Sequence, residues 1–220
     1  STSRGLGDVY KRQGRLSYGF AGRYLAEFNF GYNGSENFPK NKKFGFFPSV
    51  AIGYNLSEEK FWEPLRNIIP QFKIRASWGL VGNDQTGAGR FTFLENLTNS
   101  GAGFTTGTGN QTHTNSGPVW KRYANPNLTW EVGEKWNAGI DVRILKGFSF
   151  SADIFKEVRK EIFMDRGTIP TLMGLGNVTV QGNLGKMRNW GIDTSVDYNN
   201  QINKDLFVSF KGTFTFAHNK

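Results

Sequence analysis

Residues that commonly carry out catalysis or bind metals are sparse in this chain of 220 residues. It has no Cys, and its two His, His113 and His218, are far apart in the sequence, so we expect no zinc site. No G-x-S-x-G motif is present to position a serine nucleophile. Asn83, Asp84 and Asp165 have the oxygen donors that calcium prefers, but turns favour the same residue types. The sequence therefore predicts no enzyme, no metal and no cofactor.

The side chains best suited to ligand binding are aromatic and lie in the long segment 81–127. Aromatic faces stack on sugar rings, and the Asn, Thr and Arg around them supply hydrogen bonds. The alternative is that these residues pack the loop onto itself or against a second protein, because long loops also need packing. The candidate ligand contacts are Phe91, Phe93, Phe104, Trp120, Arg122 and Tyr123.

The elements that must hold this loop are strands, because apolar residues elsewhere recur with period two. Every second residue from Phe72 to Leu80 is apolar, for example, and polar or small residues lie between them. Segment 56–71 instead predicts a brief helix, with Ser57 as its N-cap and Pro70 beyond its end. The eight predicted strands are 16–20, 24–32, 44–56, 72–80, 136–144, 148–154, 190–198 and 206–216.

Short and long connections alternate between these strands. The short ones are 21–23, 145–147 and 199–205, and the long ones are 33–43, 81–127 and 161–187. Short turns at one end and long loops at the other are typical of an up-and-down outer-membrane barrel, with periplasmic turns and extracellular loops. We therefore predict an all-β, antiparallel segment of a transmembrane β-barrel.

In such a barrel the apolar face of each strand meets lipid and the polar face lines the lumen. Aromatic residues near strand ends would form the girdle that membrane interfaces favour. The predicted girdle residues are Trp78, Trp130, Trp136, Trp190, Tyr32, Tyr54 and Tyr198. The predicted lumen residues are Glu27, Lys73, Arg75, Asp141, Arg143, Asp153, Asp193, Asp197 and Lys211. Their mixed charges predict cross-strand ion pairs that stiffen the wall.

Three residues constrain this scheme. Glu134 falls on the lipid-facing register, where a charge at the bilayer midplane costs about 2–4 kcal/mol, so the strand must extend above the membrane to reach it. Lys156 requires the same extension of the next strand. Pro48 removes a ladder donor within a strand, and we expect a local bulge near the rim to accommodate it.

The distribution of charge bears on possible partners. The net charge is +9, but Lys and Arg are scattered and no strand carries a basic stripe, so we expect no nucleic-acid partner. We expect the positive surplus to face the extracellular loops.

Both ends of the chain look cut, as in a fragment. Residues 1–13 fit none of the patterns that follow, and we interpret them as a sequence scar or a disordered tail before a partial barrel in 14–220.

Five segments, in order, carry a resemblance to a known family. They are GRYLAEFNFGYNGSENF (22–38), KKFGFFPSVAIGYNLSEE (42–59), FKIRASWGLVGND (72–84), NPNLTWEVGEKWNAGIDV (125–142) and NLGKMRNWGIDTSVDY (183–198). These segments resemble the SusC/RagA family of TonB-dependent outer-membrane transporters of Bacteroidetes. The resemblance implies a plugged barrel of about 22 strands, of which this chain supplies eight from the C-terminal half.

The resemblance also implies partners and a location. Members lie in the outer membrane of Gram-negative bacteria, contact TonB through a plug domain that this chain lacks, and pair with a SusD-like surface lipoprotein. They import oligosaccharides, and some take peptides instead. We therefore predict part of the barrel of a nutrient importer, most simply for oligosaccharides. Isolated in water, such a fragment would expose open edges and an apolar face, and we expect it to aggregate.

Three alternatives stay open at this point. A complete eight-stranded barrel of the small OmpA type would serve as a membrane anchor. An outer-membrane barrel enzyme would need a nucleophile and a base together, and the sequence offers no such pair. A soluble all-β adhesin would bury the Trp residues in a core.

Overall fold

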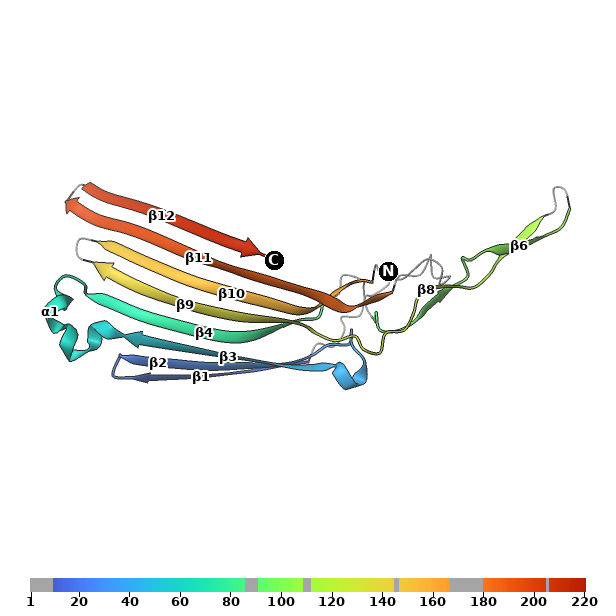
Figure 1. Cartoon of the computed structure of the whole chain (residues 1–220), viewed down its shortest axis with the longest axis horizontal. Helices are drawn as coiled ribbons and strands as arrows, with labels where there is room; N and C mark the ends of the chain where they lie inside the picture. Colours follow the sequence, from blue (N-terminus) through green and yellow to red (C-terminus); the bar gives the residue numbers. More distant parts are fainter. Residues whose placement is uncertain (1–9, 86–90, 109–111, 145–146, 167–179, 205) are drawn as a thin grey trace.

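The computed structural model describes residues 10–85, 91–108, 112–144, 147–166, 180–204 and 206–220. Eight long antiparallel strands form one sheet in the order β1-β2-β3-β4-β9-β10-β11-β12 (Figure 1). They are β1 (Tyr10–Phe20), β2 (Tyr24–Gly34), β3 (Phe44–Asn55), β4 (Gln71–Asn83), β9 (Glu131–Ile144), β10 (Phe148–Asp165), β11 (Gln181–Asn203) and β12 (Leu206–Asn219). The eight strands predicted from the period-two pattern are confirmed.

The sheet does not close on itself. β1 and β12 stand at its two edges and do not pair with each other. A small, complete eight-stranded barrel requires that pairing, so this alternative is wrong for the described sheet. β1 begins at Tyr10, and residues 10–13 pair with residues 31–34 of β2. Residues 1–9 lie outside the described part, and whether residues 1–13 are native stays a prediction.

The strands reach further toward the long loops than their alternating segments suggest. β9 begins at Glu131, β10 continues to Asp165, and β11 begins at Gln181. The extensions that Glu134 and Lys156 required are therefore present. The predicted long connection 161–187 shrinks accordingly, and its residues 167–179 lie outside the described part, as do residues 145–146 of a predicted short turn.

Segment 56–70 is helical only in short pieces. Two 3-10 turns, η2 (Leu56–Glu58) and η3 (Lys60–Trp62), lead into one α-helical turn, α1 (Glu63–Arg66). The predicted N-cap role of Ser57 is wrong, because this residue lies inside η2, and its carbonyl oxygen accepts hydrogen bonds from the Arg66 guanidinium at 2.7 and 3.2 Å. These bonds hold the segment compactly at the short-turn end.

Pro48 lies in β3 without the predicted bulge. Pairing with β2 runs through Phe30↔Pro48 with no shift of register. Pairing with β4 extends only to Ser49↔Gly79. Pro48 therefore lies just past the end of the ladder between β3 and β4, where the absence of a backbone N–H donor is least costly.

The segment between β4 and β9 carries strands that the sequence did not reveal. β5 (Asn96–Thr98) pairs with β8 (Val119–Arg122), and β6 (Gly103–Thr106) pairs with β7 (His113–Ser116). These two small sheets form an arm that extends away from the large sheet at its long-loop end (Figure 1). A further 3-10 turn, η1 (Lys40–Lys42), lies in the connection from β2 to β3.

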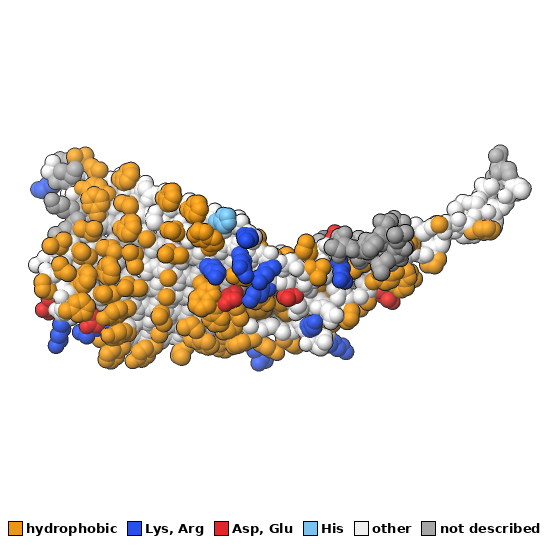
Figure 2. Space-filling view, in the orientation of Figure 1, with side chains coloured by type: hydrophobic (Ala, Val, Ile, Leu, Met, Phe, Trp, Pro, Cys, Tyr) orange, Lys and Arg blue, Asp and Glu red, His pale blue; other side chains and the backbone are white. Residues whose placement is uncertain are grey.

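Most large apolar side chains lie on one exposed face of the sheet. Figure 2 shows them as a broad belt across the strands. Leu16 is 70% exposed, Ile154 60% and Phe214 64%, so this belt is not a core. The alternative of a soluble adhesin, which needs that face buried, is wrong for the described residues. No helix in the described part of the chain is long and apolar enough to cross a membrane.

Candidate functional site

The buried apolar cluster of the described residues lies at the long-loop end of the sheet. Its centre is Phe38, Leu128 and Trp130, which are 2%, 0% and 7% exposed. Side chains packed against this centre come from β3, β9, β10 and the arm segment, namely Phe47, Phe93, Val132 and Phe163. We call these seven residues the rim cluster.

The rim cluster joins loops that are far apart in the sequence. Trp130 packs against Phe38 with ring centroids 5.1 Å apart and against Phe47 at 5.3 Å. Because Phe38 precedes β3 and Trp130 precedes β9, these contacts fasten two loops to the wall. The predicted girdle position of Trp130 is wrong, since a side chain packed between loops does not meet lipid. Trp130 was predicted as a girdle residue because it lies just before a strand, and the period-two pattern carries no information on packing between loops.

The predicted ligand-binding residues fall into three places. Trp120 and Tyr123 stack with ring centroids 5.6 Å apart, and Arg122 between them donates from Nε to the Leu94 carbonyl at 3.2 Å. Phe91 and Phe93 meet edge to face at 6.5 Å, and Phe93 also packs on the rim cluster. Phe104 lies apart on β6 and is 74% exposed.

A polar hollow of about 820 Å³ borders Tyr123. Its walls come from residues 123–127 and Thr129, from the loop-side ends of β10 and β11 and the residues next to them, and from Lys42. Asn125, Asn127, Gln181 and Asn183 contribute side-chain amides to the lining. The sequence analysis missed these residues, because the segments that carry them are separated by about 50 positions in the chain.

Some of these amides hold the hollow together and others are available to a ligand. Asn125 Nδ2 donates to the Gln181 carbonyl at 2.9 Å, and Asn183 Nδ2 donates to the Thr129 carbonyl at 2.9 Å. In the described part of the chain, the side chains of Asn127 and Arg166 make no hydrogen bond, and neither does the Tyr123 hydroxyl. A phenol hydroxyl, an amide and a guanidinium group therefore lie around this hollow without hydrogen-bond partners among the described residues.

Below the rim, charged side chains share the face opposite the apolar belt. Arg75 bridges two carboxylates, with Nη2 2.7 Å from Asp153 Oδ2 and Nε 3.1 Å from Asp141 Oδ2. The Nε contact is an ion pair without hydrogen-bond geometry. Lys135 faces Glu157 across β9 and β10 at 3.8 Å, a pair of directly opposed residues. The predicted cross-strand ion pairs are therefore present.

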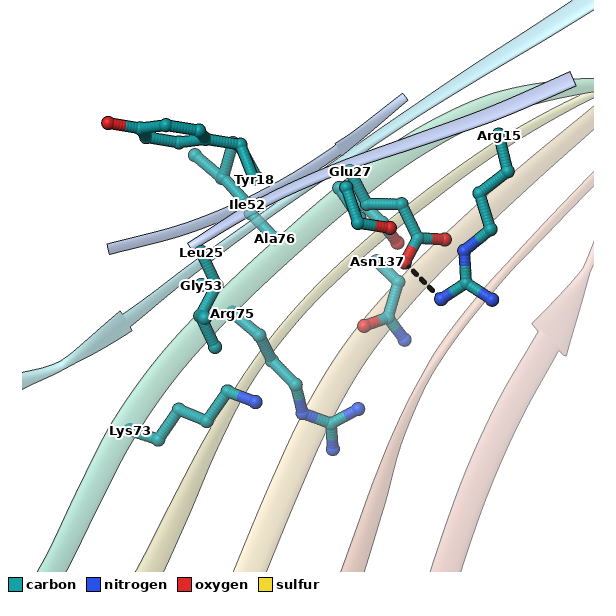
Figure 3. Close-up of a pocket in the computed structure, with 14 residues that line it drawn as sticks. Arg15, Tyr18, Leu25, Glu27, Ile52, Gly53, Lys73, Arg75, Ala76 and Asn137 are labelled. Carbon is teal, nitrogen blue, oxygen red and sulfur yellow. Dashed lines mark hydrogen bonds and ion pairs between the residues drawn. The ribbon is translucent and has the colours of Figure 1, made fainter. Parts of the chain in front are cut away.

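A hollow of about 430 Å³ lies along this face. Figure 3 shows Lys73, Arg75 and Asn137 extending from neighbouring strands to one side of the sheet, with an ion pair between Arg15 and Glu27 close by. Among the described residues, the predicted lumen residues Lys73, Arg143 and Asp193 have no ion-pair partner, whereas Asp197 pairs with Lys211 at 3.6 Å. That the whole face lines a lumen stays a prediction.

The other predicted girdle residues lie on the apolar face in two rows. Tyr54 and Tyr198 lie at the short-turn end. Tyr32, Trp78, Trp136 and Trp190 lie toward the long loops, and Trp136 is 52% exposed. Contact of these rows with lipid headgroups stays a prediction.

Glu134 lies just beyond the tryptophan row, outside the span that we assign to the membrane. Its carboxylate accepts hydrogen bonds from Trp78 Nε1 at 3.2 Å and from Trp136 Nε1 at 3.1 Å, and it pairs with Lys160 at 3.6 Å. The indole donors of Trp78 and Trp136 hold the pKa of Glu134 below its usual range, with a smaller contribution from Lys160. The carboxylate is therefore ionised and fixes the orientation of both indoles.

Two glycines of the alternating strands are required by close approach. A Cβ on Gly191 would overlap the Phe216 carbonyl oxygen and the Phe155 ring, and one on Gly139 would overlap the Asp153 carboxylate. Gly191 lies in β11 and Gly139 in β9, each on a strand of the large sheet. The lack of a side chain at Gly139 leaves room for the Asp153 carboxylate, which pairs with Arg75.

Comparison with known proteins places these features in a family context. The model of the family described as TonB dependent receptor-like, beta-barrel matches residues 6–220. TonB-dependent receptor SusC of Bacteroides thetaiotaomicron is 29% identical over 94% of this chain, which corresponds to 20% of that protein. TonB-dependent receptor P3 of Formosa agariphila is 30% identical over 94% of this chain and 19% of that protein. The chain thus spans about a fifth of the length of these curated relatives.

Solved structures show the same fold. The RagAB peptide transporter superposes with a TM-score of 0.78 at 21% identity, over 96% of this chain and 22% of that one. The siderophore receptor PirA from Pseudomonas aeruginosa superposes with a TM-score of 0.56 at 15% identity, over 95% and 34% of the two chains. The eight-stranded sheet therefore corresponds to part of a much larger barrel wall.

Proposed function

The chain belongs to the TonB-dependent receptor β-barrel family, whose barrels lie in the outer membrane, and from this premise we propose that it forms part of the wall of a nutrient importer. Its loops bind substrate on the extracellular side and its charged inner face lines the transport path. The wall supplies shape and polarity rather than reaction chemistry, in keeping with relatives that are named as receptors.

The observation that carries this proposal is the polar hollow beside Tyr123. An oligosaccharide presents hydroxyl groups around flat, weakly apolar ring faces, so it needs many hydrogen-bonding groups and an aromatic surface. Asn127, Arg166 and Tyr123 offer these groups at one place, and the Trp120 ring stacks on Tyr123. The rim cluster supports the site by fixing residues 128–130 against β3, β9 and β10.

Oligosaccharide is the substrate class that we propose first. Peptide is the second candidate, favoured by the fold shared with the RagAB peptide transporter. Side-chain amides and a guanidinium also pair well with peptide backbone groups, so the hollow accommodates either chemistry. Binding measurements with both classes of ligand separate the two.

The proposal includes two protein partners. A SusD-like surface lipoprotein would cover the extracellular loops, and the exposed arm of β5–β8 offers it a contact surface at the long-loop end (Figure 1). TonB would act through a plug domain outside residues 1–220 and open the path for substrate. Both roles follow from the resemblance to the SusC/RagA family.

Substitutions in the hollow test the proposal in the full-length receptor. N127A removes an amide that has no internal partner, while the backbone carbonyl that accepts Lys42 Nζ at 3.0 Å stays in place. N115A on β7 is the matched control, because this Asn is exposed on the arm, away from the hollow. We expect N127A and Y123A to weaken oligosaccharide binding about fivefold each, as the loss of one hydrogen bond or stacking contact predicts.

The measurement is calorimetric titration of the purified receptor with oligosaccharide and peptide libraries. Weakening by N127A and Y123A but not by N115A supports the site. A loss of peptide binding with unchanged oligosaccharide binding would favour the second candidate. Unchanged binding of both ligand classes in both variants would show that the hollow is not the substrate site.

A further inference from the structure

A group of four basic side chains lies where the apolar belt ends on the long-loop side. Figure 2 shows Lys and Arg side chains gathered at this boundary. We call Lys156, Lys160, Lys186 and Arg188 the basic patch. Each is an exposed residue on the face of its strand that carries the apolar belt, since Lys156 continues the alternation of Ile154 and Arg188 continues that of Trp190 and Ile192.

Strand pairing fixes the height of the basic patch relative to the tryptophans. Lys156 lies directly opposite Trp136 on β9 and Trp190 on β11. Arg188 pairs with Val158, one lipid-facing step further from the membrane. The basic patch therefore begins at the tryptophan row and extends outward from it, at the level that lipid headgroups occupy.

The positive charge of the basic patch is largely uncompensated within the described residues. Glu134 is the one described carboxylate within 4.0 Å of any of the four, and it lies 3.6 Å from Lys160 Nζ. At the short-turn end of the sheet Arg23 pairs with Glu59 and Arg66 with Glu58, whereas Lys60 and Lys204 have no ion-pair partner among the described residues. The basic patch differs from these in bringing four cations together on neighbouring strands with one carboxylate among them.

An apolar groove leads up to the basic patch. It has a volume of about 390 Å³, and Lys156 stands at its upper end. Its floor is shallow because Ala76 and Ala138 are opposed in the register of β4 and β9. Larger side chains of the belt flank this floor, including Ile52, Trp78, Trp136 and Ile154. A single alkyl chain fits such a channel.

We propose that the groove and the basic patch together bind an anionic lipid of the outer leaflet, with an acyl chain in the groove and headgroup phosphate on the four cations. Charge complementarity selects phosphate, and the apolar groove immediately below selects a ligand that carries an acyl chain. A free phosphate would leave the apolar groove empty, and an acidic protein surface carries no acyl chain to fill it. The outer leaflet of this membrane type supplies phosphorylated glycolipid, which has both parts.

The test uses the full-length receptor, purified in detergent and titrated with diphosphorylated lipid A, with binding followed by native mass spectrometry. A cation close to an anionic lipid surface contributes about a fivefold factor in binding, so K186Q/R188Q should weaken binding about 25-fold. K60Q/K204Q removes two exposed cations at the short-turn end and should change binding less than twofold. Dephosphorylated lipid A should bind the unmodified receptor as weakly as the phosphorylated form binds K186Q/R188Q.

A second variant tests the groove without altering charge. A138L places a larger side chain on the groove floor and should weaken lipid A binding at least fivefold, with no effect on binding of inorganic phosphate. Migration of the folded barrel in unheated gels identifies any variant that fails to fold, and single K186Q, with an expected fivefold effect, then replaces the double variant. Unchanged lipid A affinity in K186Q/R188Q, or full competition by inorganic phosphate, would overturn the proposal. Loss of a co-purifying protein from K186Q/R188Q with unchanged lipid A affinity would overturn it too.

Discussion

Removing the side chain at the centre of the rim cluster should release the substrate-binding loops without disturbing the membrane wall. Leu128 is 0% exposed, so L128A leaves a cavity that the neighbouring Phe38 and Trp130 rings cannot easily fill. Buried Leu→Ala substitutions cost about 2–5 kcal/mol, and we take about 3 kcal/mol as the expected value. The cost falls on the loops that the rim cluster joins, because the strands below are held by their own ladders.

Amide hydrogen exchange in the full-length receptor measures this loss directly. The amides to follow are those of Asn125, which donates to the Phe93 carbonyl, Leu128, which donates to the Asn125 carbonyl, and Thr129, which donates to Asn183 Oδ1. If they exchange by opening of the rim cluster, a loss of about 3 kcal/mol accelerates them about 100-fold. Amides in the middle of β9 should exchange at their original rate.

The matched control is L97A in the same loop. Leu97 lies on β5 and is 53% exposed, so its truncation leaves no cavity and should change exchange less than threefold. Equal exchange rates in L128A and L97A would refute the claim that the rim cluster holds the loops. Acceleration that spreads through β9 in L128A would instead show that loops and wall unfold as one unit.

Three further predictions concern the wall. A double-mutant cycle with R75Q and D153N should give a coupling free energy of about 1 kcal/mol in barrel unfolding, because the 2.7 Å pair is only partly shielded from water; zero coupling would contradict it. W136F removes one indole donor, so the pKa of Glu134 should rise toward its ordinary value. The depressed pKa of Glu134 stabilises the fold at pH values above the ordinary pKa of a Glu, and this stabilisation is lost as the pH falls through the depressed pKa. The free energy of unfolding of W136F should therefore vary less with pH in that acidic range. G147A should destabilise the barrel by more than about 1 kcal/mol in thermal unfolding, since Gly147 has φ +81° and its Cβ would overlap a carbonyl of β11; an unchanged transition would refute this.

The wall was predictable because one physical rule governs it. Each membrane strand separates lipid from a polar interior, so its side chains must alternate, and the sequence records that alternation residue by residue. The placement of Glu134 followed from the cost of a charge in lipid and required a longer strand, which β9 provides. The ion pairs of Arg75 followed from the mixed charges on one register.

The loop end was less predictable because no periodic rule governs it. The arm strands β5–β8 are three or four residues long and pair locally, so they leave too short a pattern to detect. The rim cluster depends on contacts between Phe38, Trp130 and Phe163, which one sequence without relatives does not connect. The polar hollow depends on the same long-range folding, and so its amides went unnoticed.

Position relative to the membrane also determines what an aromatic or charged residue does in this wall. Trp136 and Trp130 are six positions apart, yet one is 52% exposed at the edge of the belt and the other is buried among loops. Lys135 and Lys156 lie on neighbouring strands, yet one pairs with Glu157 on the inner face and the other stands unpaired among the lipid-facing residues. On the inner face, carboxylates of the same wall neutralise Arg75, Lys135 and Lys211. On the outer face Lys156, Lys186 and Arg188 have no carboxylate partner among the described residues, and an anionic lipid is the partner that we propose for them.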